Sequence, residues 1–248
     1  MFWTHLIPGT RRGEDADGLR NNVGVHELPR GAMFMASALT ILARDLGFLQ
    51  SAETEAATLG NGEPVPLMSY GFIEYVMALD LRNFDCLELG GGRSTQFWAK
   101  RMNKVLTLET DLETAGRLGI GKPGNLEIAH VEASRLPVAA GQSGPFDAVI
   151  IDAAANRVAC ARSALNILKP GGFVVLDNSD WYPNAARTLR DGDLIQVDFH
   201  DFRPSHHYRC ATSIFLHRDF RPKPLADRLP PQPLGGKTPT EPNRWDSP

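Results

Sequence analysis

The order of hydrophobic and polar positions predicts alternating strands and helices over the central part of the chain. Short, nearly continuous apolar runs recur there, and segments with helical spacing separate them. Continuous apolar runs are typical of parallel strands that are covered on both faces. The expected strands are 85–89, 104–109, 126–131, 146–152, 172–177, 194–200 and 208–217. This pattern predicts a doubly wound α/β fold with a mostly parallel seven-stranded sheet, in which a final hairpin supplies an antiparallel edge strand.

The same pattern divides the chain into three parts. Residues 1–63 form an expected N-terminal arm and helical extension, because residues 1–28 lack periodicity and 30–50 has helical spacing. Residues 64–219 hold the α/β domain. Eight of the 29 residues from Phe220 onward are proline, so we expect 220–248 to be a tail that is disordered or draped over the surface.

Composition narrows the classes of function. The 248 residues are 42% hydrophobic and 22% charged, with a formal net charge of −3, as in an ordinary soluble protein. No dense run of Lys and Arg is present, so neither a nucleic-acid partner nor a membrane surface is expected. Three cysteines without a Cys-x-x-Cys pair suit reduced thiols and a cytoplasmic location. Nothing in the sequence indicates the oligomeric state.

A glycine-rich segment after the first expected strand is the strongest motif. Three glycines, Gly90, Gly91 and Gly92, connect a buried strand that contains Glu88 to a helix start that Ser94 is expected to cap. Glycines let the backbone turn sharply and let a ligand approach it closely. Free amides at a helix start bind negative groups. The loop therefore predicts a site for the pyrophosphate of a dinucleotide or for the carboxylate of S-adenosylmethionine.

Two residues favour the second of these ligands. Thr95 stands where a dinucleotide loop has its third glycine, and the charge of Glu88 would oppose a pyrophosphate but suit an ammonium and a sulfonium. Glu109 ends the second strand 19 residues after Gly90, a spacing that allows a hydrogen bond to a ribose diol in either ligand. An NAD-dependent oxidoreductase is disfavoured and remains an alternative.

Residues 64–217 resemble the class I S-adenosylmethionine-dependent methyltransferases. The resemblance rests on the glycine loop, on Glu109, and on the segments 131–137, 146–152 and 168–176. It implies a Rossmann-like fold, S-adenosylmethionine as the cofactor and methyl transfer as the activity. It also implies that Glu132, Ala133 and Ser134 flank the adenine. Asp152, at the end of the fourth strand, is a further candidate for a contact with the cofactor.

Polar residues end the fourth and fifth expected strands. Asp152 ends one, and Asp177 with Asn178 ends the other. The resemblance implies the family's strand order 3-2-1-4-5, in which these ends are neighbours. Three oxygen-bearing side chains there suit Mg²⁺ or another divalent cation. The pattern resembles the metal-dependent O-methyltransferases, which carry a lysine three residues after the first Asp. Ala155 stands there instead, so the resemblance supplies no lysine base.

Two residues are candidates for the catalytic base. Asp152 is one, either beside a metal or without one, and His206 in the loop before the last strand is the other. Trp181 and Tyr182 could stack on an acceptor ring or cover the following helix. A neutral hydroxyl needs a base or a metal to become nucleophilic, so we expect O-methylation of a small-molecule or saccharide acceptor.

Two further alternatives remain open. Aminopropyl transfer uses a related nucleoside, but beyond Asp152 and Asp177 no acidic cluster is evident that would hold a polyamine. A binding protein that keeps this fold without its chemistry has no distinguishing sequence feature.

Overall fold

The computed structural model describes residues 29–54 and 56–237, so the expected arm over 1–28 and the last part of the tail lie outside the described residues. The chain separates into two compact units, Met1–Thr40 and Ile41–Pro248. In the first unit, helix α2 (Arg30–Thr40) buries none of its residues, and Phe34 and Met35 are exposed on it. The second unit holds the sheet, the helices that cover it and the candidate functional site.

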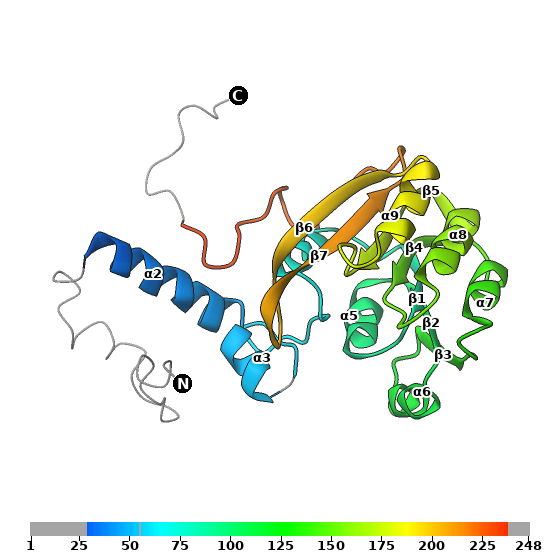
Figure 1. The fold of residues 1–248 in the computed structure, drawn as a ribbon, viewed down its shortest axis with the longest axis horizontal. Helices are drawn as coiled ribbons and strands as arrows, with labels where there is room; N and C mark the ends of the chain where they lie inside the picture. The colour runs from blue at the N-terminus through cyan, green and yellow to red at the C-terminus, as the bar shows by residue number, and fades with distance from the viewer. Residues whose placement is uncertain (1–28, 55, 238–248) are drawn as a thin grey trace. The chain divides into compact units, whose positions relative to one another are not determined.

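A seven-stranded sheet forms the centre of the second unit (Figure 1). Its order is β3-β2-β1-β4-β5-β7-β6, and all neighbours pair in parallel except those of β7. The strands are β1 (Asp85–Leu89), β2 (Lys104–Glu109), β3 (Leu126–His130), β4 (Phe146–Ile151), β5 (Leu168–Asp177), β6 (Ile195–Arg203) and β7 (His206–Leu216). The carboxyl ends of β1, β2, β4 and β5 therefore lie at one edge of the sheet.

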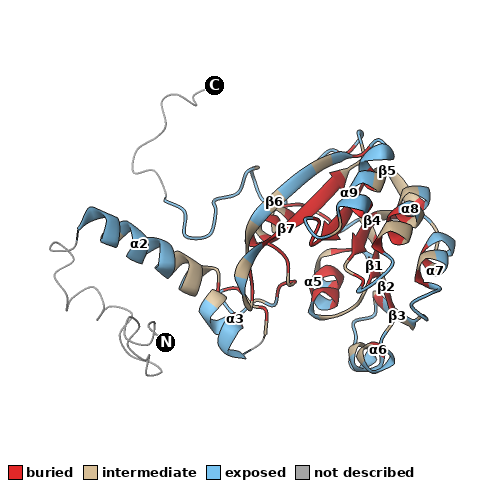
Figure 2. Ribbon diagram, viewed as in Figure 1, coloured by how far each residue is buried: buried red, intermediate tan, exposed pale blue. Residues whose placement is uncertain are grey.

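Helices cover both faces of this sheet, which gives three layers. Alternate residues of each strand face opposite layers: along β4, Ala148 and Ile150 join one buried cluster, and Val149 and Ile151 join the other. Helices α4 and α5 contribute to the first cluster, and α7, α8 and α9 contribute to the second. Figure 2 shows the central strands as buried and the outer helix faces as exposed. The helices are α4 (Tyr70–Met77), α5 (Arg93–Arg101), α6 (Leu112–Gly119), α7 (Leu136–Gln142), α8 (Arg157–Ile167) and α9 (Pro183–Asp191).

The hairpin of β6 and β7 extends past the carboxyl edge of the sheet. Asp177, the last residue of β5, pairs with Thr212, so residues 206–211 of β7 continue beyond that point. At about 3.3 Å per residue this overhang reaches about 20 Å. Ser205 at the hairpin turn donates a hydrogen bond to the carbonyl of Ser51 in α3 (Phe48–Thr54). The hairpin is therefore anchored at both ends and borders the edge where the expected site residues lie.

The predicted fold class is confirmed, including the final hairpin at one edge of the sheet. The antiparallel strand β7 lies between β5 and β6. A turn of only two residues, Pro204 and Ser205, joins β6 to β7, so β6 pairs along the outer side of β7 and forms the edge.

The expected domain boundaries need correction at both ends. On the N-terminal side, the predicted helix over 30–50 divides into α2, a π-helical turn η2 (Ile41–Asp45) and α3. The chain after it joins the core of the α/β unit, where Ala57 and Leu59 are each 2% exposed. These residues belong to the domain because they fill its hydrophobic core.

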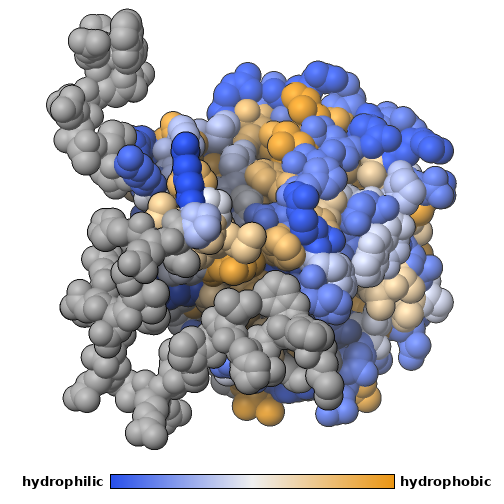
Figure 3. Space-filling model, turned by 60° about the vertical axis from the view of Figure 1, so that its left-hand side comes forward, coloured by the Kyte–Doolittle hydropathy of each residue, from blue (hydrophilic) through white to orange (hydrophobic). Residues whose placement is uncertain are grey.

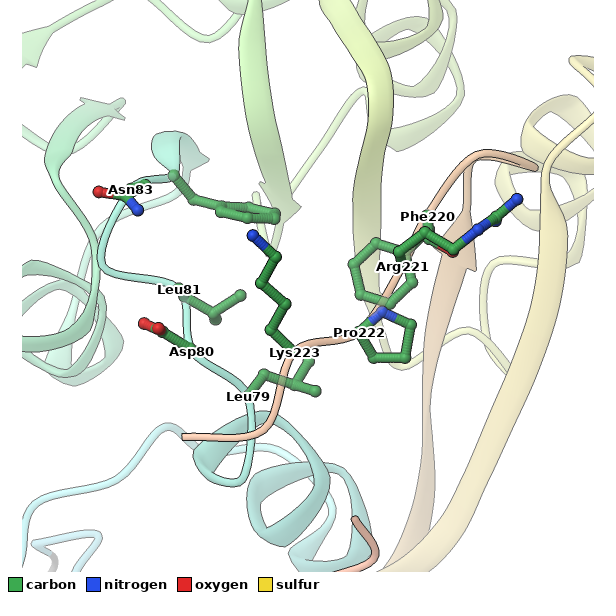
Figure 4. Close-up of a pocket in the computed structure, with 9 residues that line it drawn as sticks. Leu79, Asp80, Leu81, Asn83, Phe220, Arg221, Pro222 and Lys223 are labelled. Atoms are coloured by element: carbon green, nitrogen blue, oxygen red, sulfur yellow. The ribbon is translucent and has the colours of Figure 1, made fainter. Parts of the chain in front are cut away.

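The first part of the proline-rich tail is packed. Phe220 is buried, and its ring meets that of Phe173 edge-on at 5.8 Å. Lys223 and Leu225 form backbone hydrogen bonds with Asp80 and Ala78. Figure 4 shows the small pocket that this segment forms with the chain before β1. This pocket lies at the amino end of β1, the opposite edge from the glycine loop.

Among the described residues, no single helix is long and apolar enough to cross a membrane, although one bent pair of helical segments reaches that length and apolarity together. On the face drawn in Figure 3, hydrophilic residues predominate over the α/β part, with hydrophobic ones scattered among them.

We expect Phe220→Ala to lower the free energy of unfolding by about 3–5 kcal/mol, the usual cost of emptying a buried phenylalanine site. The control is Leu225, which is exposed. Leu225→Ala should change the free energy of unfolding by less than about 0.5 kcal/mol. Urea unfolding of both variants measures the difference. Equal stability of the two variants would show that the segment after β7 is not packed.

Candidate functional site

The glycine loop is confined by the protein on one side and open on the other. Gly90 has a φ of +91°, and a Cβ added there would lie 2.8 Å from the carbonyl oxygen of Asp152. A Cβ on Gly91 would lie 2.7 Å from the Thr107 side chain. A Cβ on Gly92 would meet nothing within 4 Å. The first two glycines are therefore required by the fold, whereas the space at Gly92 is available to a ligand.

Glu88 lies beneath this loop and is fully buried. Its carboxylate accepts hydrogen bonds from Ser94 Oγ at 2.6 Å, Thr95 Oγ1 at 2.6 Å and Thr107 Oγ1 at 2.8 Å. Thr95 Oγ1 also accepts the amide of Gly92 at 3.0 Å. Glu88 thus joins β1 to α5 and β2 and fixes the loop between them.

These contacts correct two sequence predictions. Glu88 does not face a ligand, because its carboxyl group is fully buried and its hydrogen-bond partners are three protein hydroxyls. Ser94 does not cap α5, because its hydroxyl is committed to Glu88 and Gly92 holds the cap position. Both residues shape the glycine loop from below.

Burial raises the pKa of Glu88 to about 7, and the hydroxyl hydrogen bonds only partly oppose that effect. The folded protein therefore holds a proton on Glu88 at pH values where the unfolded chain has lost it. The stability that this group contributes is fully present below its ordinary pKa of 4.5 and is lost as the pH rises through about 7.

Glu109 ends β2 beside the loop, as the sequence predicts. One carboxylate oxygen accepts the amide of Gly91, and the other accepts the amide of Asp111 at 2.7 Å. A carboxylate has about four lone-pair sites, so these bonds leave acceptor capacity for a diol. The predicted ligand fits here, because a ready acceptor and the open space at Gly92 belong to the same loop.

Ala133 and Ser134 lie in an exposed turn after β3. The carbonyl of Ala133 accepts a hydrogen bond from the Asn156 side chain at 2.8 Å, which places this turn beside the loop after β4. Their expected contact with an adenine ring stays a prediction.

Asp152 and Asp177 are brought together at the ends of β4 and β5, each against an arginine. Arg157 Nη2 lies 3.2 Å from Asp152 Oδ1, and Arg203 Nη1 lies 3.4 Å from Asp177 Oδ2. The other oxygen of Asp177 accepts a hydrogen bond from Thr212 at 2.7 Å. Burial, together with the charge of Asp177, raises the pKa of Asp152 to about 7. Burial also raises the pKa of Asp177.

This arrangement does not fit the predicted divalent cation. Both oxygens of Asp177 already have protein partners. In the amide orientation that satisfies its neighbours, Asn178 donates to Asp177 at 2.8 Å and accepts from Arg203 at 3.0 Å. In the described part of the chain, no group of three or more His, Cys, Asp or Glu side chains could hold a metal ion. The carboxylates are balanced by guanidinium groups instead.

The sequence does not predict that Arg157 and Arg203 lie beside these two aspartates. Arg157 is the first residue of α8, and Arg203 is the last residue of β6, so neither falls in a motif. The spacing of Arg157 gives one indication of its pairing, because it follows Asp152 by only five residues at the start of a helix. The position of Arg203 depends on the hairpin, and no local pattern reveals it.

His206 lies at the start of β7, by the hairpin turn, where its Nδ1 is 3.1 Å from the carbonyl of Pro204. Its ring meets Tyr208 edge-on at 5.3 Å. Tyr208 also stacks with Trp181, whose side chain is 56% exposed, at 6.2 Å between ring centres. Tyr182 covers the Arg157 guanidinium at 4.2 Å. The contacts place His206 in an aromatic cluster and leave its role as a base a prediction.

We expect Glu88→Gln to remove part of the pH dependence of stability. As the pH rises from 5 to 8, the free energy of unfolding of the natural protein should fall by a few kcal/mol, at about 1.4 kcal/mol per pH unit for one group. The variant should fall less, since glutamine does not titrate. Urea unfolding at several pH values measures this, and identical slopes would contradict the burial of Glu88.

No protein-family model matches the sequence, and no curated protein sequence matches it. Many solved structures resemble it in fold. A precorrin-6y C5,15-methyltransferase from Geobacter metallireducens is 16% identical, with 67% of this chain and 96% of that chain covered and a TM-score of 0.50. Fibrillarin from Aeropyrum pernix with natively bound S-adenosyl-L-methionine is 14% identical, with 59% and 74% covered and a TM-score of 0.47. At such identities the likeness concerns the fold alone, and the chain has the Rossmann-like fold of the class I methyltransferases.

Proposed function

We propose that this protein transfers a methyl group from S-adenosylmethionine to a hydroxyl oxygen of a small-molecule or saccharide acceptor. One observation carries the proposal. The glycine loop, which is open at Gly92, lies directly against the end of β4, where Asp152 is located. The amide of Asp152 is also bonded to Leu89 at 2.9 Å. A donor bound on this loop and a base at Asp152 would therefore be neighbours.

The residues around the loop suit S-adenosylmethionine better than NAD. A dinucleotide loop uses a third glycine for close packing of the helix on the strand, but Thr95 holds that position and bonds to Glu88. Gly92 and Ser94 begin helix α5, whose first amides can hold the methionine carboxylate. Glu109 would accept from the ribose, and the turn at Ala133 and Ser134 would border the adenine.

Asp152 is the base in this proposal. When bound, S-adenosylmethionine supplies an electrophilic methyl group attached to a sulfonium. Asp152 accepts the proton of the acceptor hydroxyl, and a pKa near 7 suits a general base at neutral pH. Its side chain is 30% exposed, so the proton can pass on to water.

The acceptor would lie along the overhanging hairpin. Trp181 presents an exposed indole that Tyr208 supports from one side. A flat aromatic surface can stack on another ring or on the apolar face of a sugar.

Binding of the demethylated product, S-adenosylhomocysteine, tests the cofactor site. We expect Gly92→Leu to weaken it at least tenfold, because the new side chain fills the open space. Gly116→Leu is the matched control, since Gly116 in α6 also has nothing within 4 Å of an added Cβ. Glu109→Ala should cost about 1.5–3 kcal/mol through loss of a charged hydrogen bond. Calorimetry measures all three, and unchanged affinity in Gly92→Leu would contradict the assignment.

A mass-spectrometric screen of hydroxyl compounds with isotope-labelled S-adenosylmethionine tests the activity. For an acceptor found in this way, Asp152→Asn should lower turnover by about 10²–10⁴ while S-adenosylhomocysteine still binds. Asp191→Asn, at an exposed position in α9, is the control and should turn over normally. Full activity of Asp152→Asn would exclude Asp152 as the base, and His206 would be tested next.

A further inference from the structure

We propose that Arg157 and Arg203 take the place of a divalent cation between Asp152 and Asp177, and that Arg157 is the positioning residue for Asp152. The inference rests on the proposed function only for the role of Asp152 as a base. The replacement of a metal by two guanidinium groups is carried by contacts alone.

Arg157 joins the ends of β4 and β5. Its Nε donates to the carbonyl of Ala153 at 2.7 Å, Nη1 donates to the carbonyl of Asp177, and Nη2 approaches Asp152 Oδ1 at 3.2 Å. The ring of Tyr182 covers the guanidinium at 4.2 Å, and the side chain is 5% exposed. A planar guanidinium that donates a hydrogen bond from each of its three nitrogens has one orientation available, so it fixes the carboxylate that it meets.

Arg203 reaches the same edge from β6. It is paired with Asp177, and its Nη2 lies 3.3 Å from the hydroxyl of Tyr208. A longer contact of 3.4 Å joins Nη1 to the carbonyl of Leu67, ahead of α4. Arg203 therefore connects the sheet edge to the hairpin and to the chain that precedes α4.

The charges leave no place for a metal ion. Two carboxylates face two guanidinium groups, so with both carboxylates ionised the cluster carries no net charge before any ion arrives. A divalent ion would have to displace both arginines or be buried beside them, and like charges in a poorly solvated site repel strongly. Arginine also stays charged at any physiological pH.

The same contacts leave Asp152 available for chemistry. Only Oδ1 meets Arg157, and within the described residues Oδ2 has no hydrogen-bond partner. Arg157 therefore holds one oxygen while the other is free to accept a proton. A bound metal ion would instead take the carboxylate of Asp152 as a ligand.

Manganese binding to the full chain is the first test. Electron paramagnetic resonance should show no Mn²⁺ bound at this edge in the natural protein, so Asp177→Asn should not change the amount bound. A bound ion that Asp177→Asn removes would overturn the replacement of the metal. This test is independent of methyl transfer, and loss of S-adenosylhomocysteine binding would instead count against the proposed function.

Carbon-13 resonances of the aspartate carboxyl groups, assigned with Asp152→Asn, give the second test. The charged groups that act on Asp152 are Asp177, Arg157, Glu88 and Arg203. We expect Arg157→Gln to raise the pKa of Asp152 by about one unit or more, because the cation that favours its ionised form is gone. Arg157→Lys, which keeps the charge, should raise it less, and Arg162→Gln, at an exposed site on α8, should not change it. An unchanged pKa of Asp152 in both Arg157 variants would refute the positioning role.

Discussion

The hydrogen bonds of the buried Glu88 carboxyl group are the interaction on which the glycine loop depends. Three hydroxyl groups from α5 and β2 converge on it, and one of them, on Thr95, also holds the amide of Gly92. A buried acid is stable only when its hydrogen-bonding needs are met, so the loop cannot move without breaking this set. The open space at Gly92 and the amides of α5 are therefore preformed for a ligand.

A second set of charged groups lies across the loop, and all of its members except Asp152 are buried. Asp152 and Asp177 are held by arginines that come from the start of α8 and from the hairpin. This exchange of a metal for guanidinium groups gives the edge a fixed geometry with one carboxylate oxygen left free. The two sets meet where the backbone at Gly90 contacts the end of β4. In the proposed function, that contact would set the position of the methyl donor relative to the base Asp152.

The sequence predicts the strands well because their apolar runs are local and buried on both faces. It also predicts which residues end those strands, and thus places Glu109, Asp152 and Asp177 at one edge of the sheet, with Asp152 and Asp177 on neighbouring strands. It fails for features that depend on distant partners. The role of Glu88 requires knowing that Thr107 lies beside it, and Arg203 reaches Asp177 only through the hairpin. Packing of Phe220 against Phe173 likewise overrides a proline-rich composition.

Hydrogen exchange followed by mass spectrometry tests the central claim, which is that the glycine loop holds S-adenosylmethionine. With S-adenosylhomocysteine added to the full chain, the account predicts slower exchange in residues 89–95 and 109–111 and no change in residues 220–225. NAD at the same concentration should leave all three segments unchanged. Protection of the loop by NAD and not by S-adenosylhomocysteine, or by neither ligand, would contradict the account.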